Sequence, residues 1–255
     1  MSIAPNRAAL KRRLDRYFWA NSSAEMVLLR EIFSSHFDSF DRVAVLGGLV
    51  RDFARAGRSA FRSDVDLVIE APAERVSDLA NILKARPNRF GGFGLRSGLW
   101  RIDFWALETT WAARHAGVPV KRIEDVLQCT FFDWDAAAYD LGSRQVLYSA
   151  GYLDRIKSAM IDINLAATPS VEGNLLRSIR RIVLWHLKPG PALSEFIEKN
   201  LDDSMLYKIQ NNERRLPSCH VTLGWKNARI AHQYLLEPDW RTLETKQLDL
   251  DFPVP

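Results

Sequence analysis

The chain of 255 residues lacks the patterns of a disulfide-rich, zinc-binding or membrane-spanning protein. Cysteine occurs only at Cys129 and Cys219, and neither belongs to a CxxC motif, so we predict two buried free thiols in a reducing compartment. No uncharged run approaches the roughly 20 residues that cross a bilayer, and no apolar segment follows the basic residues near the N-terminus. These absences predict a soluble, cytoplasmic protein without membrane contact.

Several common catalytic signatures are missing as well. The sequence contains no GxSxG or HExxH motif, and it has neither of the glycine-rich loops of dinucleotide and P-loop sites, GxGxxG and GxxxxGKS/T. Serine hydrolysis and histidine-based metal chemistry are therefore not predicted. Lys and Arg number 35 against 31 Asp and Glu, and this net charge of +4 permits an acidic partner such as nucleic acid without requiring one.

The first hundred residues have the pattern of an α/β protein. Residues 43–46 are continuously apolar and are followed by Gly47-Gly48, which predicts a buried strand and a tight turn into a helix over 49–56. Residues 64–69 predict a second strand. We also predict a hairpin and three amphipathic helices, the hairpin from residues 89–95 and 99–107 and the helices over 8–18, 24–37 and 74–85.

From about residue 108 the spacing of apolar residues becomes mostly helical. Helical segments are predicted over residues 123–127, 136–139, 151–161 and 171–187. Pro189-Gly190-Pro191 is the best linker signal in the chain, and residues 237–255 predict an extended or poorly ordered tail. A mostly helical second half therefore follows the α/β half.

Three acidic residues point to a site for a divalent cation. Asp64 and Asp66 are two residues apart on a predicted strand, so both side chains project to one face, about 6–7 Å apart along the chain. If the hairpin strand that carries Asp103 pairs beside them, a third carboxylate joins this face. Three clustered carboxylates repel one another unless a cation lies among them, and Mg²⁺ held by carboxylates and substrate phosphates is the natural occupant. Two such ions could serve an in-line displacement.

Gly47 and Gly48 supply a second element of such a site. Without a Cβ atom, both residues let backbone N–H groups approach a phosphate at the positive end of the following helix. A glycine pair after an apolar run is often only a turn, and its functional weight comes from the neighbouring Arg51-Asp52 pair and from the carboxylates.

These residues occur in an order that is similar to a known family. The run LGGLVRD at residues 46–52, followed by SDVDL at 63–67, resembles the GGxVRD and DxDL signatures of class II CCA-adding enzymes and bacterial poly(A) polymerases. Both belong to the polymerase-β-like nucleotidyltransferase superfamily. The resemblance implies an α/β head with a mixed sheet of about five strands, a mostly α-helical neck and two Mg²⁺ ions. It also implies transfer of a nucleoside monophosphate to a hydroxyl with release of pyrophosphate.

The resemblance also implies a role for each candidate residue. Asp64 and Asp66 would hold metal, and Asp103 would be the third carboxylate, nearest the attacking 3′-hydroxyl. The nucleotide-binding residues would be Gly47 and Gly48 at the phosphates, with Arg51 and Asp52 as a pair that braces the loop and the nucleotide.

A fainter resemblance extends into the second half. Residues 130–141 are similar in layout to the family's RRDFTINALAYDL segment. The similarity places Asp135 where the family has Asn and implies that Asp135 is a nucleotide-binding residue. Residues 175–180 are similar to its LLRAIR helix, which makes Arg177 and Arg180 candidate phosphate contacts. Cys129-Thr130-Phe131 stands in place of the family's Arg-Arg-Asp, and no clean EDxxR motif, which selects the base in this family, is present.

The resemblance predicts four segments along the chain. N-terminal helices over 1–40 would pack on a nucleotidyltransferase head over 41–128, and a helical neck over 129–190 would precede a short helical or extended region over 191–255. The leading hypothesis is an enzyme that adds nucleotides from a nucleoside triphosphate to an RNA 3′ end, with tRNA as one candidate. The alternatives are a protein or small-molecule acceptor, as in a toxin or defence enzyme, and a nucleotide- or RNA-binding protein that has lost catalysis.

Overall fold

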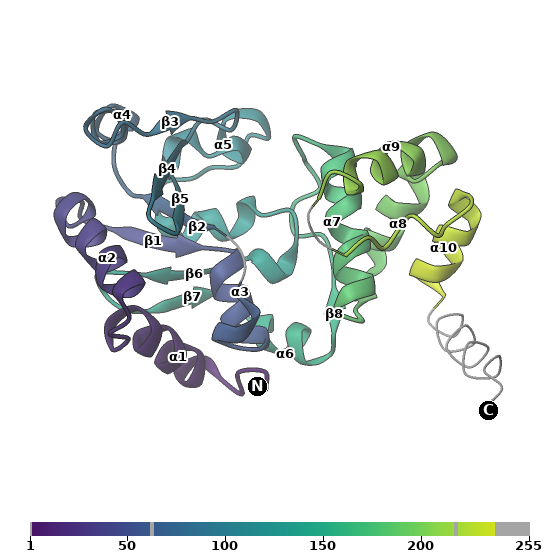
Figure 1. Ribbon diagram of the computed structural model, residues 1–255, viewed down its shortest axis with the longest axis horizontal. Coiled ribbons are helices and arrows are strands. Elements are labelled where there is room, and N and C mark those ends of the chain that lie inside the picture. Colours follow the sequence, from purple (N-terminus) through teal and green to yellow (C-terminus); the bar gives the residue numbers. More distant parts are fainter. Residues whose placement is uncertain (1, 62–63, 217–218, 238–255) are drawn as a thin grey trace. The chain divides into compact units, whose positions relative to one another are not determined.

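The computed structural model describes residues 2–61, 64–216 and 219–237 (Figure 1). The chain divides into two compact units. The first contains Met1–Ser158 and Asn164–Ala167, and the second contains Ala159–Ile163 and Thr168–Pro255. The four segments predicted along the chain, with boundaries at residues 40, 128 and 190, stay a prediction. The predicted tail over 237–255 lies, from residue 238 onward, outside the described residues.

The first unit is built on a mixed seven-stranded sheet with the order β3-β4-β5-β2-β1-β6-β7. Among the described residues, β2 and β5 are parallel, and the other neighbouring strands of this sheet are antiparallel. The sheet has more strands than the five or so expected, because short strands extend both of its edges. The strands are β1 Val43–Leu46, β2 Val65–Ile69, β3 Arg86–Pro87, β4 Phe93–Ser97, β5 Trp100–Ala106, β6 Ala137–Asp140 and β7 Val146–Tyr148.

Strand β6 corrects a sequence prediction. Residues 136–139 were predicted to be helical, and this prediction is wrong, because Ala137–Asp140 pairs with β1 on one side and β7 on the other. All four residues of β6 are buried. A strand that is covered on both faces shows no alternation of apolar and polar residues, so a short apolar run cannot be assigned from periodicity alone.

The two faces of β2 and β5 differ in character. Val65, Leu67 and Ile69 alternate with Asp66 and Val68, and the first three are fully buried on one face. On β5, Phe104 shares this face with Leu67 and meets Phe37 with ring centroids 5.6 Å apart. The opposite face is covered toward the end of β2 by a cluster that includes Val68, Ile123 and Val126. The beginning of that face carries the acidic residues.

Helices of the first unit pack around this sheet (Figure 1). Helix α3 contacts β1, β2 and β6, and α4 contacts β5. The predicted helices near the N-terminus and after β2 are confirmed. The helices of the first unit are α1 Arg7–Trp19, α2 Ala24–Ile32 with the π-helix η1 Phe33–Phe37, α3 Gly48–Arg55, α4 Ala73–Ile82, α5 Trp111–His115 and α6 Tyr152–Lys157. Short 3₁₀ helices are η2 Arg58–Ala60, η3 Leu107–Thr109, η4 Ile123–Cys129 and η5 Asp133–Asp135.

The described part of the second unit is mostly helical. Its elements are α7 Val171–Leu184, α8 Pro191–Asn200, α9 Asp203–Glu213, α10 Ala228–Leu236 and a two-stranded parallel pair, β8 Met160–Ile161 and β9 Lys188–Pro189. Glu213 is fully buried, accepts hydrogen bonds from the backbone N–H and hydroxyl of Thr222, and pairs with Arg180 at 2.9 Å. This network ties α7 and α9 to the loop before α10, since a buried carboxylate requires partners.

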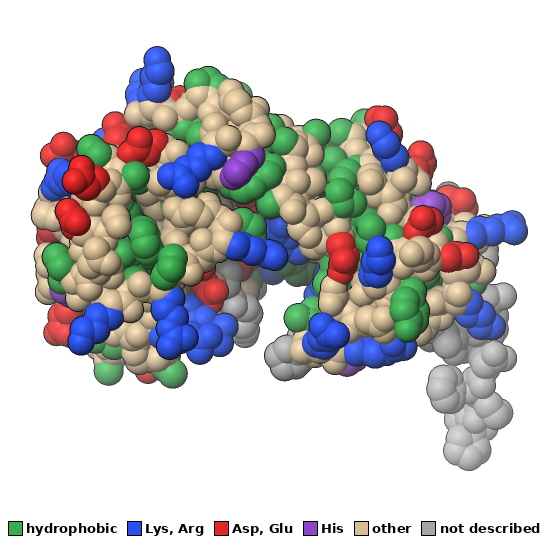
Figure 2. Space-filling model, turned by 90° about the horizontal axis from the view of Figure 1, so that it is seen from above, with side chains coloured by type: hydrophobic (Ala, Val, Ile, Leu, Met, Phe, Trp, Pro, Cys, Tyr) green, Lys and Arg blue, Asp and Glu red, His purple; other side chains and the backbone are tan. Residues whose placement is uncertain are grey.

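The surface carries charges of both signs. Figure 2 shows Lys and Arg side chains interspersed with Asp and Glu over the face in view, with hydrophobic side chains scattered between them. None of the helices in the described residues has the length and apolar character needed to cross a bilayer. Cys129 is half-buried, and burial raises the pKa of its thiol to about 11. Cys219 is exposed, so the prediction that this thiol is buried is wrong.

Candidate active site

Most of the candidate residues from the sequence lie at one end of the central strands. We call this end of the strands the edge that carries the carboxylates. Strands β1 and β2 are antiparallel with Val45 opposite Leu67, so the end of β1 lies beside the beginning of β2. Strands β1 and β6 are also antiparallel, with Leu46 opposite Ala138. The turn after β1, the start of β2 and the residues just before β6 therefore meet at the same place, although they are far apart in the sequence.

The register between β2 and β5 brings two carboxylates together. Asp66 lies directly opposite Asp103 on the parallel neighbouring strand, and directly paired residues point to the same face. Asp64, two residues before Asp66, precedes β2 at this edge and is partly buried. The expected pairing of the Asp103 strand beside the Asp64 and Asp66 segment is thus the observed one.

The carboxylates strongly influence one another. Burial is the largest cause of a rise in the pKa of Asp66, to about 7, and three neighbouring negative charges add to it, those of Asp103, Asp64 and Asp135. Burial and the charge of Asp64 also raise the pKa of Asp103. The ionised forms are therefore disfavoured at this edge without a compensating cation.

The donor set fits Mg²⁺. Its donors are carboxylate oxygens, which hard divalent cations prefer, and their raised pKa values indicate negative charge that a cation would neutralise. Across the described ranges, no three His, Cys, Asp or Glu side chains are arranged to enclose a metal ion by themselves. Proteins often hold Mg²⁺ with one or two carboxylates and complete its shell with water and substrate phosphates.

The glycine turn joins β1 to α3. Gly47 has a φ of +67° and a ψ of −110°, a backbone conformation that strains any residue with a Cβ atom. Its N–H donates to the carbonyl oxygen of Ala137 at 2.8 Å, and α3 begins at the next residue, Gly48, which is partly buried. The positive end of the α3 dipole therefore lies at the edge that carries the carboxylates.

Arg51 is a buried brace behind this turn. Its Nη1 lies 2.6 Å from Oδ1 of Asp135, and its Nη2 lies 3.0 Å from Oδ1 of Asp52. Only 8% of its side chain is exposed, and the two carboxylates raise the pKa of its guanidinium further, against the effect of burial. Asp135, predicted to bind the nucleotide, thus contacts Arg51 and links α3 to the segment before β6. Contact between these three side chains and a nucleotide stays a prediction.

Two predicted phosphate contacts belong to the second unit. Arg177 is exposed on α7 and donates to Asn174, one turn earlier. Arg180 pairs with Glu213 and donates to the carbonyl oxygen of Cys219 at 2.7 Å. Both side chains already have protein partners, and their contact with phosphate stays a prediction.

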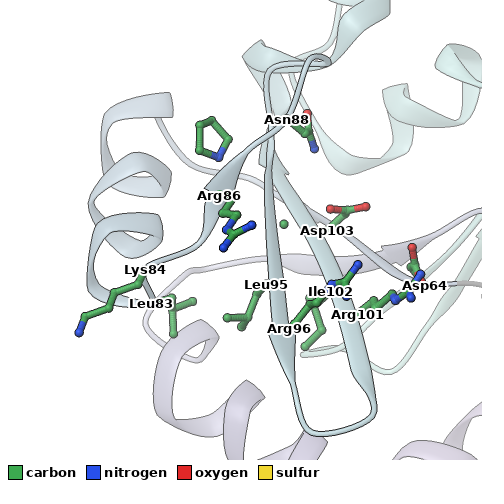
Figure 3. Close-up of a pocket in the computed structure, with 12 residues that line it drawn as sticks. Asp64, Leu83, Lys84, Arg86, Asn88, Leu95, Arg96, Arg101, Ile102 and Asp103 are labelled. Carbon is green, nitrogen blue, oxygen red and sulfur yellow. The ribbon is translucent and has the colours of Figure 1, made fainter.

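A basic pocket beside the carboxylates was not predicted from the sequence. Its volume is about 750 Å³, and its lining includes Asp64 and Asp103 together with basic residues from the segment 84–101 (Figure 3). The basic residues are Lys84, Arg86, Arg96 and Arg101. The signal that could have found them is the hairpin register, because a turn centred on Gly98 and Leu99 places Arg96 opposite Arg101.

Solved structures with a similar fold include tRNA-processing enzymes. A CCA-adding enzyme solved with ATP has a TM-score of 0.51 at 19% identity, with 78% of this chain and 50% of that chain covered. The Thermotoga maritima CCA-adding enzyme, solved with tRNA, has a TM-score of 0.51 at 20% identity, with coverage of 82% and 51%. The apo form of a tRNA-processing enzyme has a TM-score of 0.50 at 18% identity, with coverage of 76% and 54%.

These likenesses define the fold. No protein-family model matches the chain, and no curated protein matches it in sequence. The chain spans about half the length of the solved structures that it resembles. The mixed sheet and its helices, with the helical region that follows, share the fold of these solved enzymes.

Proposed function

We propose that this chain is a Mg²⁺-dependent nucleotidyltransferase that transfers a nucleoside monophosphate from a nucleoside triphosphate to the 3′-hydroxyl of an RNA, as in tRNA end addition or polyadenylation. The observation that carries the proposal is the register of Asp66 opposite Asp103, at the edge where the Gly47-Gly48 turn begins α3. This edge combines a carboxylate pair with backbone donors suited to phosphate, which the reaction requires.

Solved structures with a similar fold support the proposed nucleotide transfer. They include a CCA-adding enzyme described in complex with ATP and another described in complex with tRNA. Since this chain spans about half of each, its acceptor and base preference are part of the proposal. A cytoplasmic location, expected from the sequence, is likewise proposed.

Asp64, Asp66 and Asp103 would hold two Mg²⁺ ions with the help of the triphosphate. Bound there, Mg²⁺ would offset negative charge on the phosphates and on the attacking and leaving oxygens. The acceptor 3′-hydroxyl gives up its proton to solvent as its oxygen forms a bond to the α-phosphorus. The bond from this phosphorus to the oxygen that bridges to the β-phosphorus breaks, and that oxygen leaves as part of pyrophosphate.

The chain's own residues position the two substrates. The backbone at Gly47 and Gly48 would lie close to the triphosphate. The N–H of Gly47 is already bonded to Ala137, so the donors would be the N–H of Gly48 and the start of α3. Arg51 holds this turn through Asp52 and Asp135. Arg177 and Arg180 would add phosphate contacts. Catalysis of this type depends mainly on positioning and charge stabilisation.

A pyrophosphate-release assay tests the proposal. The full chain is incubated with Mg²⁺ and each of the four ribonucleoside triphosphates, with and without cellular RNA, alongside the Asp103→Asn variant. We expect release that depends on RNA and falls by about 100-fold or more in the variant, since an oriented carboxylate near the reacting hydroxyl contributes several kcal/mol. Release without RNA, with label on protein or a small molecule, would show another acceptor. No release in any mixture would contradict the enzyme assignment.

Substituting Gly94 tests the placement of the third carboxylate. Gly94 lies opposite Asp103, and a Cβ atom there would come within 2.9 Å of Oδ1 of Asp103. The Gly94→Ala variant should therefore displace this flexible carboxylate and lower transfer by about 10- to 100-fold, because a misplacement of about 1 Å has effects of that size. Steady-state kinetics would measure the loss, with thermal melting to check the fold. Gly142→Ala is the matched control, because its Cβ atom would meet only ordinary contacts. Equal activity in both variants would contradict the role of Asp103.

A further inference from the structure

The basic pocket next to the carboxylates has no role in the chemistry described so far. Four cationic side chains, Lys84, Arg86, Arg96 and Arg101, line it together with Asp64 and Asp103. All four are exposed, and within the described part of the chain none of them forms an ion pair. Figure 3 shows Arg86, Arg96 and Arg101 at the β4–β5 hairpin, on the side of Asp64 and Asp103, whereas Lys84 lies farther away, at the end of α4. Their charges are therefore available to an anion from outside.

The strand register orders these charges on one face of the sheet. One row across the strands reads Arg86, Gly94, Asp103 and Asp66, each directly paired with the next. A second row lies two residues farther along the hairpin from the Gly94–Asp103 pair, and in it Arg96 is paired with Arg101. Side chains two residues apart on a strand share a face, so both rows face the same side as Asp103. Cations thus flank this carboxylate across the sheet and along the hairpin.

The pairing of Arg96 with Arg101 destabilises the hairpin when no anion is bound between the two charges. Like charges directly opposite each other in an antiparallel pair destabilise the sheet. Guanidinium groups are planar forks that match a phosphate group with two parallel hydrogen bonds. A phosphate between these two rows would offset the repulsion.

The pocket is distinct from the turn assigned to the nucleotide. The Gly47-Gly48 turn follows β1, whereas Arg96 is on β4, and the order β4-β5-β2-β1 places three strand spacings, about 14 Å, between these strands. The carboxylates on β2 and β5 lie between the two. A reaction that joins two phosphorylated substrates at the carboxylates therefore has one candidate site on each side.

We propose that this pocket binds the phosphodiester backbone of the acceptor strand, next to its reactive 3′-hydroxyl. This inference rests on the function proposed above, because it assigns the second substrate of the same site. A single-stranded RNA end suits the pocket, since its phosphates are the regularly spaced anions that exposed Arg and Lys side chains recognise without reading a base. The negative side chains of Asp64 and Asp103 would sit beside the hydroxyl, and the cations beside the phosphates upstream of it.

Binding without catalysis tests the inference. The probe is a fluorescein-labelled single-stranded oligoribonucleotide with a free 3′-hydroxyl, added to the full chain in EDTA, and fluorescence anisotropy gives the affinity at several salt concentrations. The double variant Arg96→Gln/Arg101→Gln should bind about tenfold more weakly at low salt. The slope of log affinity against log salt should fall by about 1.4, the value for two lost contacts to single-stranded phosphates.

Two further variants separate this role from a general effect of charge. Lys121→Gln/Arg122→Gln removes the same charge from exposed residues of the first unit outside the pocket and should leave affinity and slope near wild type. Arg96→Lys/Arg101→Lys keeps the charge and should retain most of the salt dependence. Because neutralising opposed cations removes repulsion, the glutamine variant should melt no lower than the wild type.

The outcomes distinguish this inference from the proposed function. In the transfer assay with Mg²⁺, the glutamine variant should have a raised KM for RNA, a kcat near wild type and an unchanged KM for the nucleoside triphosphate. Unchanged affinity and slope in EDTA, or a change equal to that of the Lys121/Arg122 control, would overturn the inference even if the enzyme is active. A raised KM for the nucleoside triphosphate alone would assign the pocket to the donor and overturn it as well. Failure of the wild type to transfer nucleotide would instead count against the proposed function.

Discussion

Replacing Asp66 with asparagine is expected to abolish nucleotide transfer while making the metal-free protein more stable. Asp66 lies at the centre of the acidic group, opposite Asp103 and two residues after Asp64. The neutral amide loses the charge that would hold Mg²⁺, and a loss of several kcal/mol of transition-state stabilisation corresponds to a rate at least about 1000-fold lower. The opposite effects on activity and stability are characteristic of a functional site.

The stability gain follows from the raised pKa. In the metal-free folded protein, burial is the main reason that the pKa of Asp66 is raised to about 7, from the value of 3.8 for an aspartate side chain exposed to water. Between these values the folded state holds more protons than the unfolded state, so stability falls as the pH rises from about 4 to about 7. A tenfold change in an acid constant corresponds to about 1.4 kcal/mol. Because the side chain of Asp66 is not completely shielded from solvent, the full shift is not converted into stability, and we expect a gain of about 1–3 kcal/mol at pH 8.

Thermal and chemical unfolding in EDTA, from pH 5 to pH 8, would measure this effect. The Asp66→Asn variant should show a flatter dependence on pH than the wild type, and added Mg²⁺ should raise the wild-type melting temperature more than that of the variant. Asp78→Asn, at an exposed position of α4, is the control and should behave as the wild type. A variant that retains transfer, or that is less stable at pH 8 without metal, would contradict the account of this site.

The strand, glycine turn and helix at residues 43–56 could be predicted from local sequence. Val43–Leu46 is uniformly apolar and is followed at once by Gly47, which the structure holds at a positive φ. Asp64 and Asp66 could be placed because a strand alternates its faces. These features depend on residues that are close together in the chain, so they can be predicted from the local sequence pattern.

Features that depend on pairing between distant segments could not be predicted in the same way. The sequence of β6 is compatible with a helix and with a strand, and its pairing between β1 and β7 decides that it is a strand. The basic pocket depends on the register that sets Arg86, Gly94 and Asp103 in one row. A shift of one residue in β4 would turn its side chains to the other face, so composition alone does not reveal the pocket.

Asp135 is a candidate nucleotide-binding residue that also contacts a buried arginine. The resemblance marked its position as one that contacts the nucleotide, and the structure adds its partner, Arg51, at 2.6 Å. The same contact explains why Asp is suited to the position, since its carboxylate pairs with a buried guanidinium that also contacts Asp52. The strength of this brace can be measured.

Removing the charge of Arg51 should destabilise the first unit strongly. In the Arg51→Met variant, Asp52 and Asp135 lose a partner that is only 8% exposed, and breaking a buried pair in this way typically costs about 3–5 kcal/mol. For a unit of this size, the corresponding fall in melting temperature is about 6–20 °C. Calorimetry or urea unfolding monitored by circular dichroism would measure the change.

A double-mutant cycle shows whether this cost arises from the unpaired carboxylates. Combining Arg51→Met with Asp135→Asn should destabilise the protein by at least about 1 kcal/mol less than the sum of the two single changes, because the second change removes a charge that the first leaves unpaired. Arg122→Met, at an exposed residue, is the control and should shift stability by no more than about 0.5 kcal/mol. Strict additivity, or an Arg51→Met effect as small as the control, would mean that Arg51 does not brace the turn. A large coupling would tie the glycine turn to the segment before β6 in energy as well as in geometry.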